Sequence, residues 1–560
     1  MLGRASLVLA WPLGHLAGRG ASGGLLRVVG RRLTGDGPGA IAEAERLGSD
    51  SRAGRRTTQR MASFAIEAGA PAVAERILDA QPAPRDAREL ILRAEIDLRL
   101  GRYGAANEAA AGALELRPGD RDARRLRDWM AAELVVLDPA WKPPLAPATS
   151  ALVPVRGRVL HLLTNSLPYR QAGYTLRAQS VAISQRDAGL DPVMATRAGF
   201  PGNEGVRRAA STSVVDGIVY HRLLPDLDPR LLADRQAIRY AEAASMLVEA
   251  IRPAVLHPAS NHVNAQVALA LRDRYRIPVI YEVRGFLEET WRSRVDGETA
   301  DADRYRRSRD VETACMRAAD AVVTLSETMR QDILARGGID AERVIVVPNA
   351  VDVRRFIPGR PDAALTTRLG IGDEPVIGYI SSFTGYEGIR YLIAATAELR
   401  RRGRRVRCLL VGDGEDRAAL EAAAHDADLD DGTVIFTGRV AHDQVLDYYR
   451  LIDVFVVPRT NDRVSQLVTP LKPYEAMAME RALVVSDVGA LREIVDDGVT
   501  GRTFVAEDPI NLADVLEPLL DDRAERERLG GAARAWVETN RTWAQNGIRY
   551  RELYERLGVA

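Results

Sequence analysis

The sequence contains few cysteines and no excess of charge of either sign. Cys315 and Cys408 are its only cysteines, far apart and each in an apolar stretch. We therefore expect two buried free thiols rather than a disulfide or a cysteine metal site. Lys and Arg together number 77, as do Asp and Glu. This balance argues against a nucleic-acid partner, so any anionic ligand must be bound by local groups.

Long apolar runs are also absent. No window approaches the roughly 20 apolar residues that a membrane-spanning helix needs, so we expect a cytoplasmic protein. Residues 1–40 are basic, with five arginines before the first acidic residue, Asp36. A signal peptide fits poorly because Pro12 and Gly14 interrupt the apolar run. Three interpretations of this segment are open. It is a disordered tail, it is not translated because the start codon was assigned too early, or it binds peripherally to the inner face of the cell membrane.

The length of 560 residues exceeds what one hydrophobic core organises, so two or three domains are expected. Residues 41–137 are rich in Ala, Arg, Glu and Leu, with apolar residues at helical spacing, and predict an all-helical region. Gly101 to Pro118 resembles the second helix of a tetratricopeptide repeat, and a fainter echo runs from Gly69 to Pro82. The region either docks on the rest of the chain, forms a dimer, or binds a protein partner.

A proline-rich linker follows at residues 138–155, and the pattern then changes to apolar strands alternating with amphipathic helices. Such strands belong to parallel sheets that helices cover on both faces. The pattern restarts after Pro358, which predicts an α/β fold of two Rossmann-like domains, 156–355 and 356–540, with ligands bound at the strand carboxyl ends. A last helix, 541–560, is expected to pack back on the first of these domains. The predicted strands are 159–163, 193–195, 218–223, 254–257, 279–283, 321–325, 344–347, 376–380, 406–411, 433–437, 454–457 and 483–486.

The most informative stretch runs from Asp453 to Glu493 and includes V-T-P-L-K-P-Y-E-A-M. Together with Pro348–Asp352, Val411–Gly414 and Phe436–Val440, it closely resembles glycosyltransferase family 4 in order and spacing. The resemblance covers residues 155 to 560. It implies a GT-B fold, with an N-terminal acceptor domain and a C-terminal donor domain. It also implies retaining transfer of a sugar from a nucleotide-sugar, with no metal or other cofactor required.

The resemblance also assigns the donor site. A diphosphate suits a helix N-terminus, where free N–H groups and the positive end of the dipole meet. Val468, Thr469, Pro470 and Leu471 are expected to form that turn, and Lys472 to add a full positive charge beside the phosphates. Glu475 is expected to accept hydrogen bonds from the ribose hydroxyls. Main-chain groups near the base and phosphates are assigned to Gly412, Gly414, Gly438, Arg439 and Val440.

The N-terminal half supplies fewer candidates. Gly173 and Arg177 occupy the position of the family's glycine-rich loop facing the donor phosphates, although Arg177 could equally point to solvent from the following helix. Arg284 is a candidate for stabilising the leaving diphosphate. Glu282 either contacts the sugar or acceptor, or forms a structural ion pair with Arg284. His257 and His262, at the end of a predicted strand, either meet the acceptor or are core residues.

Three positions depart from the family pattern. The basic pair that clamps the diphosphate is replaced by Ser382 and Glu387, the first of two glutamates by Leu467, and a histidine motif by the segment 281–286. Arg284, Arg459, Arg463 and Lys472 are candidates for restoring the missing positive charge. The altered motifs resemble a subgroup linked to exported polysaccharide assembly.

The leading hypothesis is therefore a hexosyltransferase of the retaining type, acting on a polysaccharide, lipid-linked or other glycan acceptor. The acceptor loops are expected at 197–210 and 286–301, which carry no transferable code. A scaffold of little or no activity, acting through the helical region, is the alternative, and a GT-B epimerase or phosphorylase is less favoured.

Overall fold

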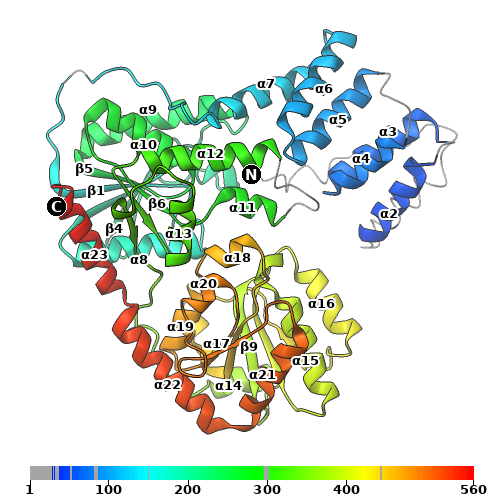
Figure 1. The fold of residues 1–560 in the computed structure, drawn as a ribbon, viewed down its shortest axis with the longest axis vertical. Coiled ribbons are helices and arrows are strands. Elements are labelled where there is room, and N and C mark those ends of the chain that lie inside the picture. The colour runs from blue at the N-terminus through cyan, green and yellow to red at the C-terminus, as the bar shows by residue number, and fades with distance from the viewer. Residues whose placement is uncertain are drawn as a thin grey trace.

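The computed structural model describes residues 28, 31, 37–50, 53–80, 86–148, 150–294, 302–441 and 444–560. The basic segment 1–40 therefore lies almost entirely outside the described residues, as does Pro82 of the fainter repeat. Three parts follow one another along the chain: a row of helices, an N-terminal α/β domain and a C-terminal α/β domain (Figure 1). No helix in the described part of the chain combines the length and the apolar character needed to cross a bilayer.

The helical region forms as expected from its periodicity. Tight turns join its helices in pairs at Gly69 and Gly101, where φ is +81° and +75°, values that favour glycine. Small side chains on α6 are fully buried and let neighbouring helices approach closely. The helices are α2 (Gly37–Gly48), α3 (Arg55–Glu67), α4 (Pro71–Asp79), α5 (Ala87–Arg99), α6 (Tyr103–Leu116) and α7 (Arg121–Val136). The repeat assignment itself stays a prediction.

The helical region is docked on the N-terminal α/β domain through its last helices. The Gly104 amide donates to Asp303 Oδ2 at 2.9 Å, and Tyr103 packs with Leu137 and Val311. Farther along, Gln266 Nε2 donates to the Val136 carbonyl at 2.8 Å. These contacts favour docking for α6 and α7. Partner binding or dimerisation through residues 41–137 stays a prediction.

The N-terminal α/β domain is built on strands in the order β3-β4-β2-β1-β5, which isolated bridges at Leu256–Val279 and Ala259–Glu282 continue into β6-β7-β8. Only β3 is antiparallel. The strands are β1 (Val155–Leu163), β2 (Asp191–Thr196), β3 (Thr212–Val215), β4 (Ile218–Arg222), β5 (Pro253–Pro258), β6 (Ile280–Val283), β7 (Ala321–Thr324) and β8 (Val344–Val346). The helices are α8 (Gly173–Asp187), α9 (Ala233–Ile251), α10 (His262–Tyr275), α11 (Leu287–Arg292), α12 (Asp303–Ala318) and α13 (Glu327–Ala335).

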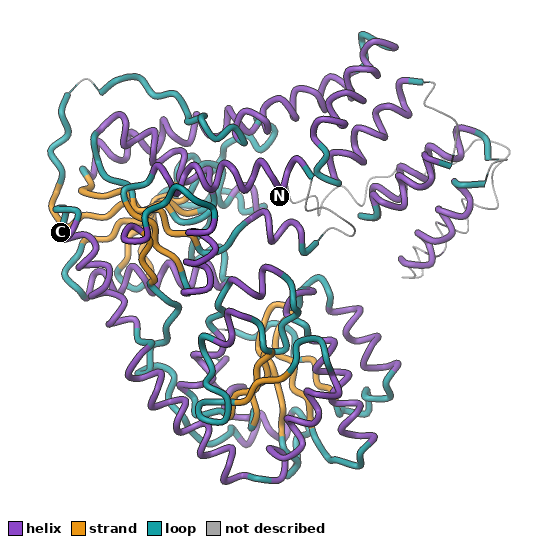
Figure 2. Tube along the Cα trace, viewed as in Figure 1, coloured by secondary structure: helices purple, strands orange, loops and turns teal. Residues whose placement is uncertain are grey.

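The C-terminal α/β domain is a fully parallel sheet in the order β11-β10-β9-β12-β13-β14. Figure 2 shows the strands of both domains enclosed by helices. The strands are β9 (Val376–Ser382), β10 (Arg407–Asp413), β11 (Val434–Phe436), β12 (Val454–Val457), β13 (Ala482–Ser486) and β14 (Arg502–Phe504). The helices are α14 (Ala363–Arg368), α15 (Ile389–Arg401), α16 (Arg417–Asp426), α17 (Val445–Leu451), α18 (Arg463–Leu467), α19 (Lys472–Ala478), α20 (Gly489–Arg492), α21 (Pro509–Asp521) and α22 (Arg523–Asn540).

The prediction of two Rossmann-like domains is confirmed, and each predicted strand overlaps a strand of the structure. The apolar runs predicted these strands correctly because central strands are buried on both faces. Two short strands were missed. β3 is mostly solvent-exposed and begins with Thr212 and Ser213, and β14 begins with Arg502 and Thr503, so neither strand carries an apolar run. Cys315 and Cys408 are buried and free, as expected.

The chain passes between the α/β domains twice. The first passage is the segment 347–351, and the second leads from α22 into α23 (Trp543–Arg556). The two passages meet where the Val351 amide donates to the Arg541 carbonyl at 3.0 Å. The last helix, α23, packs against α8 and buries Tyr550 and Tyr554 in the core of the N-terminal domain. The C-terminal end is therefore part of that domain's structure.

Candidate active site

The loop 468–471 lies where the two α/β domains touch. Asn349 Nδ2, from the first passage, donates to the Thr469 carbonyl at 2.7 Å, and Ser326 Oγ donates to the Leu467 carbonyl at 3.1 Å. Gly285, just after β6, sits so near this loop that an added Cβ would lie 3.4 Å from Val468 Cγ2. Main-chain atoms of the predicted phosphate loop are thus held by the N-terminal domain.

Lys472 and Glu475 lie one turn apart at the start of α19. Lys472 Nζ donates to Glu475 Oε2 at 2.9 Å, and the Tyr449 hydroxyl donates to the same oxygen at 2.7 Å. Glu475 is buried, whereas Lys472 is partly exposed. An ammonium carries three N–H bonds, so this contact leaves Lys472 able to bind a phosphate. The roles of both residues toward a ligand stay predictions.

Glu387 and Arg459 explain one departure from the family pattern. Glu387 stands where a basic residue was expected, and its carboxylate binds Arg459 through two contacts, 2.8 Å from Nη2 and 3.3 Å from Nε. Arg459 Nη1 also donates to the Val468 carbonyl at 2.7 Å. Both side chains are buried. Arg459 therefore supports the 468–471 loop directly, while Glu387 compensates its charge.

The glycines after β10 allow the main chain to pack closely. A Cβ at Gly412 would lie 1.8 Å from the Ser381 carbonyl oxygen, and one at Gly414 would lie 2.1 Å from that of Phe383. The Gly412 amide also donates to the Gly438 carbonyl at 3.1 Å. These contacts bring the loops after β9, β10 and β11 together. A side chain at Gly412 or Gly414 would clash with the neighbouring main chain, which explains both glycines. Their predicted contact with the nucleotide-sugar stays a prediction.

The remaining donor-domain candidates differ in their surroundings. Arg439 is exposed, and its neighbours Gly438 and Val440 are partly buried. Arg463, on α18, reaches the N-terminal domain, where it pairs with Asp332 and lies 3.4 Å from Glu289 Oε1. Its guanidinium therefore bridges the two domains.

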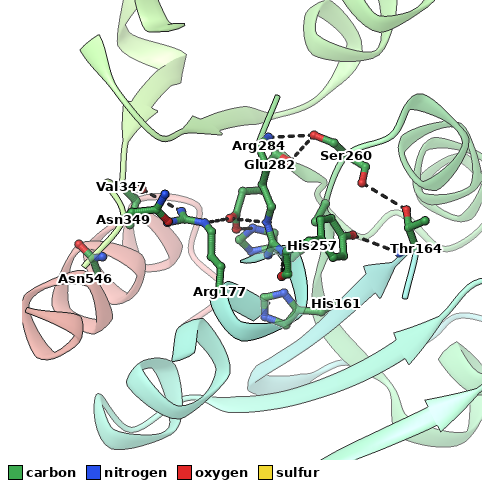
Figure 3. A network of polar contacts seen from close by, with 12 residues as sticks. His161, Thr164, Arg177, His257, Ser260, Glu282, Arg284, Val347, Asn349 and Asn546 are labelled. Carbon is green, nitrogen blue, oxygen red and sulfur yellow. Dashed lines mark hydrogen bonds and ion pairs between the residues drawn. The ribbon is translucent and has the colours of Figure 1, made fainter. Parts of the chain in front are cut away.

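Arg177 is buried on α8 rather than solvent-facing, and the close-up in Figure 3 shows it among the residues of the N-terminal domain. Its Nε donates to Glu282 at 2.8 Å. Its two terminal nitrogens donate to the Val347 and Pro348 carbonyls, to Asn349 Oδ1 and to the Tyr550 hydroxyl. These partners account for all five N–H bonds of a guanidinium. Its predicted phosphate contact would require some of them to break. Gly173 opens the same helix, with nothing within 4 Å of an added Cβ.

Glu282, at the end of β6, is the centre of this network (Figure 3). One oxygen accepts from Arg177 at 2.8 Å and from Arg284 at 2.9 Å. The other bonds His257 Nε2 at 3.0 Å and accepts from the Tyr550 hydroxyl at 3.1 Å. The carboxylate is fully buried and its oxygens are occupied. This is the ion pair with Arg284 that the sequence offered as the alternative role for Glu282.

The network contains a chain of neutral groups beside this charged centre. Burial lowers the pKa of His257 and holds that of His161 well below its usual value. Burial would raise the pKa of Glu282, but the charges of Arg284 and Arg177 outweigh it and lower that pKa well below the usual range. His257 Nδ1 bonds the Tyr554 hydroxyl at 2.6 Å. His257 and His262 are both buried, which agrees with the core interpretation.

Several buried polar atoms at the domain junction have no hydrogen-bond partner among the described residues. The most informative are Arg284 Nη2 and Thr469 Oγ1, one on each domain. Arg284 uses its other nitrogens on Glu282 and on the Tyr174 carbonyl, and its guanidinium lies over the Tyr174 ring, 4.7 Å from the centroid. Buried polar groups are nearly always satisfied, so orphaned ones point to a missing ligand or water.

Sequence reasoning missed part of this set. Ser381 Oγ and Thr384 Oγ1, in the segment that follows the β9 core, are likewise buried without partners. The sequence drew attention to this segment only through the basic residues it lacks. In the described part of the chain, no three His, Cys, Asp or Glu side chains are arranged to hold a metal ion. Positive side chains at the junction include Arg284, Lys472, Arg463 and Arg459, of which Arg459 is compensated by Glu387.

Two protein families match the chain. The family described as "Glycosyl transferases group 1" matches residues 374–522, and the one described as "Glycosyl transferase 4-like domain" matches residues 172–350. Together these regions span more than half of the 560 residues. They cover the C-terminal and N-terminal α/β domains respectively.

Curated relatives also match part of the chain. The chain is 28% identical over 250 residues to alpha-D-kanosaminyltransferase of Streptomyces kanamyceticus, covering 44% of this chain and 63% of the relative. It is 33% identical over 228 residues to D-inositol 3-phosphate glycosyltransferase of Xylanimonas cellulosilytica, covering 39% of this chain and 52% of the relative. The chain thus spans less than two thirds of each of these relatives.

Solved structures share the fold. Sucrose-phosphate synthase of Thermosynechococcus elongatus superposes with a TM-score of 0.60 at 22% identity, over 71% of this chain and 99% of that one. The Anabaena protein HepE, in complex with UDP and glucose, gives a TM-score of 0.54 at 18% identity, over 71% and 99% of the two chains. At this level of identity the likeness concerns the fold alone, and it confirms the predicted GT-B arrangement.

Proposed function

We propose that the chain is a glycosyl transferase that moves a sugar from a nucleotide-sugar donor to a glycan acceptor, because a group 1 family matches its C-terminal α/β domain and a 4-like family matches its N-terminal α/β domain. The observation that carries the proposal is the pair of unsatisfied groups, Arg284 Nη2 and Thr469 Oγ1, beside Lys472 at the domain junction. They are hydrogen-bonding groups without partners where a donor diphosphate is expected.

The donor is bound mainly by the C-terminal domain. Lys472 and the N–H groups at the start of α19 receive the diphosphate, and Glu475 accepts hydrogen bonds from the ribose. HepE was solved with UDP and with UDP-glucose, and this supports a uridine diphosphate sugar as the first donor to try. Gly438 and Val440 approach the base through their main chain.

The transfer is of the retaining hexosyl type. The departing diphosphate takes the acceptor proton from the face on which it leaves, so the protein stabilises the leaving group instead of supplying a strong base. Arg284 and Lys472 carry that charge stabilisation, one from each domain. Glu282 acts through Arg284, because it holds the Nε side of the guanidinium at 2.9 Å and leaves Nη2 free.

A scaffold with little activity is the second candidate, supported by the helical region and by the loss of the basic pair at Ser382 and Glu387. It is less favoured, because Lys472 is partly exposed at the junction and Arg284 keeps an unsatisfied nitrogen there. The acceptor is a polysaccharide, lipid-linked or other glycan, reached in the cytoplasm or at the inner membrane face. The subgroup linked to exported polysaccharide assembly fits the altered motifs.

The test compares nucleotide binding and donor turnover in the wild type and in Lys472→Gln. Calorimetry with UDP-, GDP- and ADP-sugars should detect binding of one base. Loss of a charged contact should weaken binding by about tenfold to a hundredfold. Arg492→Gln, which removes an exposed arginine of the same domain paired only with Asp487, is the control and should bind normally. Absence of binding to every nucleotide-sugar would contradict the proposal, and unchanged affinity in Lys472→Gln would contradict the phosphate assignment.

A further inference from the structure

Arg197 occupies a place in the N-terminal domain where ligands of open α/β sheets bind. It is the first residue after β2, and its amide donates to the Leu163 carbonyl, at the end of β1, at 2.8 Å. The ends of β1, β2, β5 and β6 lie along one edge of the sheet because these strands are parallel. Ligands bind beyond this edge in such sheets. Arg284, after β6, lies on the same edge.

The guanidinium of Arg197 lacks a protein partner. No hydrogen bond or ion pair in the described part of the chain involves this side chain, and its Nε is buried with no acceptor. Burial lowers the pKa of Arg197, because removal from water disfavours the charged form. Arg197 is partly exposed, but a cation whose Nε is buried without an acceptor is still costly, so such a group is expected to have a ligand. Arg177 and Arg222, which are buried nearby, differ because their terminal nitrogens donate to protein oxygens, although Arg222 Nε also lacks an acceptor.

Two further orphaned groups lie on the adjoining loop. Asn165 Oδ1 and Ser166 Oγ, two and three residues beyond the Leu163 carbonyl that accepts from Arg197, are buried and without partners. Glu204 is the carboxylate whose charge acts on Arg197. It forms an ion pair with Arg170 at 3.5 Å and makes no ion pair with Arg197. A cation, a hydroxyl and an amide, each with a buried atom that lacks a partner, therefore lie on adjoining loops at one end of the sheet.

We propose that Arg197, with Ser166 and Asn165, forms a subsite for an anionic group, a phosphate ester or a carboxylate, on the acceptor molecule. Arg197 and Ser166 donate hydrogen bonds to the anion, and Asn165 bonds a neighbouring hydroxyl. The subsite rests on the proposed function only in treating the bound molecule as the acceptor. Its anion binding does not depend on a nucleotide-sugar.

The experiment titrates the full chain with glucose, glucose 6-phosphate and glucuronate at constant ionic strength, with and without UDP. The wild type should bind at least one of the two anionic sugars about tenfold or more tightly than glucose, as a charged hydrogen bond predicts. Which one binds distinguishes a phosphate from a carboxylate. Arg197→Met should abolish the preference, while Arg239→Met, at an exposed arginine on α9 of the same domain, should keep it.

The melting temperature of each variant and its nucleotide binding are measured separately from anion binding. Arg197→Met should melt no lower than the wild type, since it removes a partly buried charge that has no partner among the described residues. If it does unfold, Arg197→Lys keeps the charge without the planar fork and should retain a weakened preference. No anionic preference in the wild type, or a preference unchanged in the Arg197 variants, would overturn the subsite. Anion binding without any nucleotide binding would leave the subsite standing and reject the transferase proposal.

Discussion

Replacing Glu387 with Gln removes the negative partner of Arg459 and changes little in shape. The guanidinium stays buried, because Nη1 remains bonded to the Val468 carbonyl at 2.7 Å. Its charge is then uncompensated in a place where both side chains of the pair are less than a tenth exposed, at 6% and 9%. Arg459→Gln leaves the opposite problem, a buried carboxylate contacted only by the Tyr379 hydroxyl.

The burial of the pair sets the size of the effect. An exposed ion pair contributes about 1 kcal/mol or less, but removing one partner of a buried pair costs roughly 3–5 kcal/mol. For a unit of about 150–250 residues, which is the size of the C-terminal domain, each kcal/mol lowers the melting temperature by about 2–4 °C. Either single variant should therefore lower the melting of that domain by roughly 6–20 °C. The double variant Glu387→Gln/Arg459→Met should lose less than the two single variants combined, because no charge remains unpaired.

Differential scanning calorimetry of the full chain measures the melting, and UDP titration measures the site. Glu387→Gln should keep or raise UDP affinity, since it frees positive charge, whereas Arg459→Gln should lower it. Asp487→Asn alters the half-buried partner of the exposed Arg492 in the same domain and keeps an oxygen for the Ala506 amide; it is the control and should shift melting by less than about 2 °C. Losses below about 1 kcal/mol in both single variants would refute the argument that the pair is buried and coupled.

Two further predictions concern the N-terminal domain and the domain junction. Burial raises the pKa of Glu312 to about 8, so this carboxyl is neutral in the folded state and should destabilise the fold as pH rises from about 4.5 through 8. Melting curves at pH 5 and 9 should show Glu312→Gln more stable than the wild type at pH 9 only, and equal differences at both pH values would contradict this. Arg463→Ala should weaken the contact between the domains and increase the radius of gyration in X-ray scattering, whereas Arg492→Ala should not. An unchanged radius would show that the bridge to Asp332 does not hold the domains together.

The sequence predicted the architecture well because its strands are buried on both faces. A continuous apolar run such as 454–457 indicates a strand that is buried on both faces. It can therefore be recognised as a central strand before its neighbours in the sheet are known. The order and spacing of the motifs then indicated the family resemblance, because Lys472, Glu475 and the glycines after β10 follow one another along the chain as they do in the family. The exposed β3 strand, which has no such run, went unnoticed.

Contacts between side chains far apart in the sequence could not be predicted from the sequence. Arg177 and Glu282 are 105 residues apart, and Glu387 and Arg459 are 72 apart, yet each pair is in direct contact. A local pattern could name Arg177 as a phosphate ligand or a solvent-facing residue, but neither alternative included its five bonds to protein groups. Only the packing of α8 against β6, the segment 347–351 and α23 brings those acceptors together.

The sequence by itself determined which residue types stand at the domain junction and the order of the secondary structure that carries them. The tertiary structure decided which charges are already compensated and which are free to meet a ligand. Arg177 and Arg459 are neutralised by buried carboxylates, whereas Arg284 keeps one unsatisfied nitrogen and Arg197 has no partner among the described residues. The physical reason is that charge compensation depends on distances of a few ångströms between groups brought together only by folding.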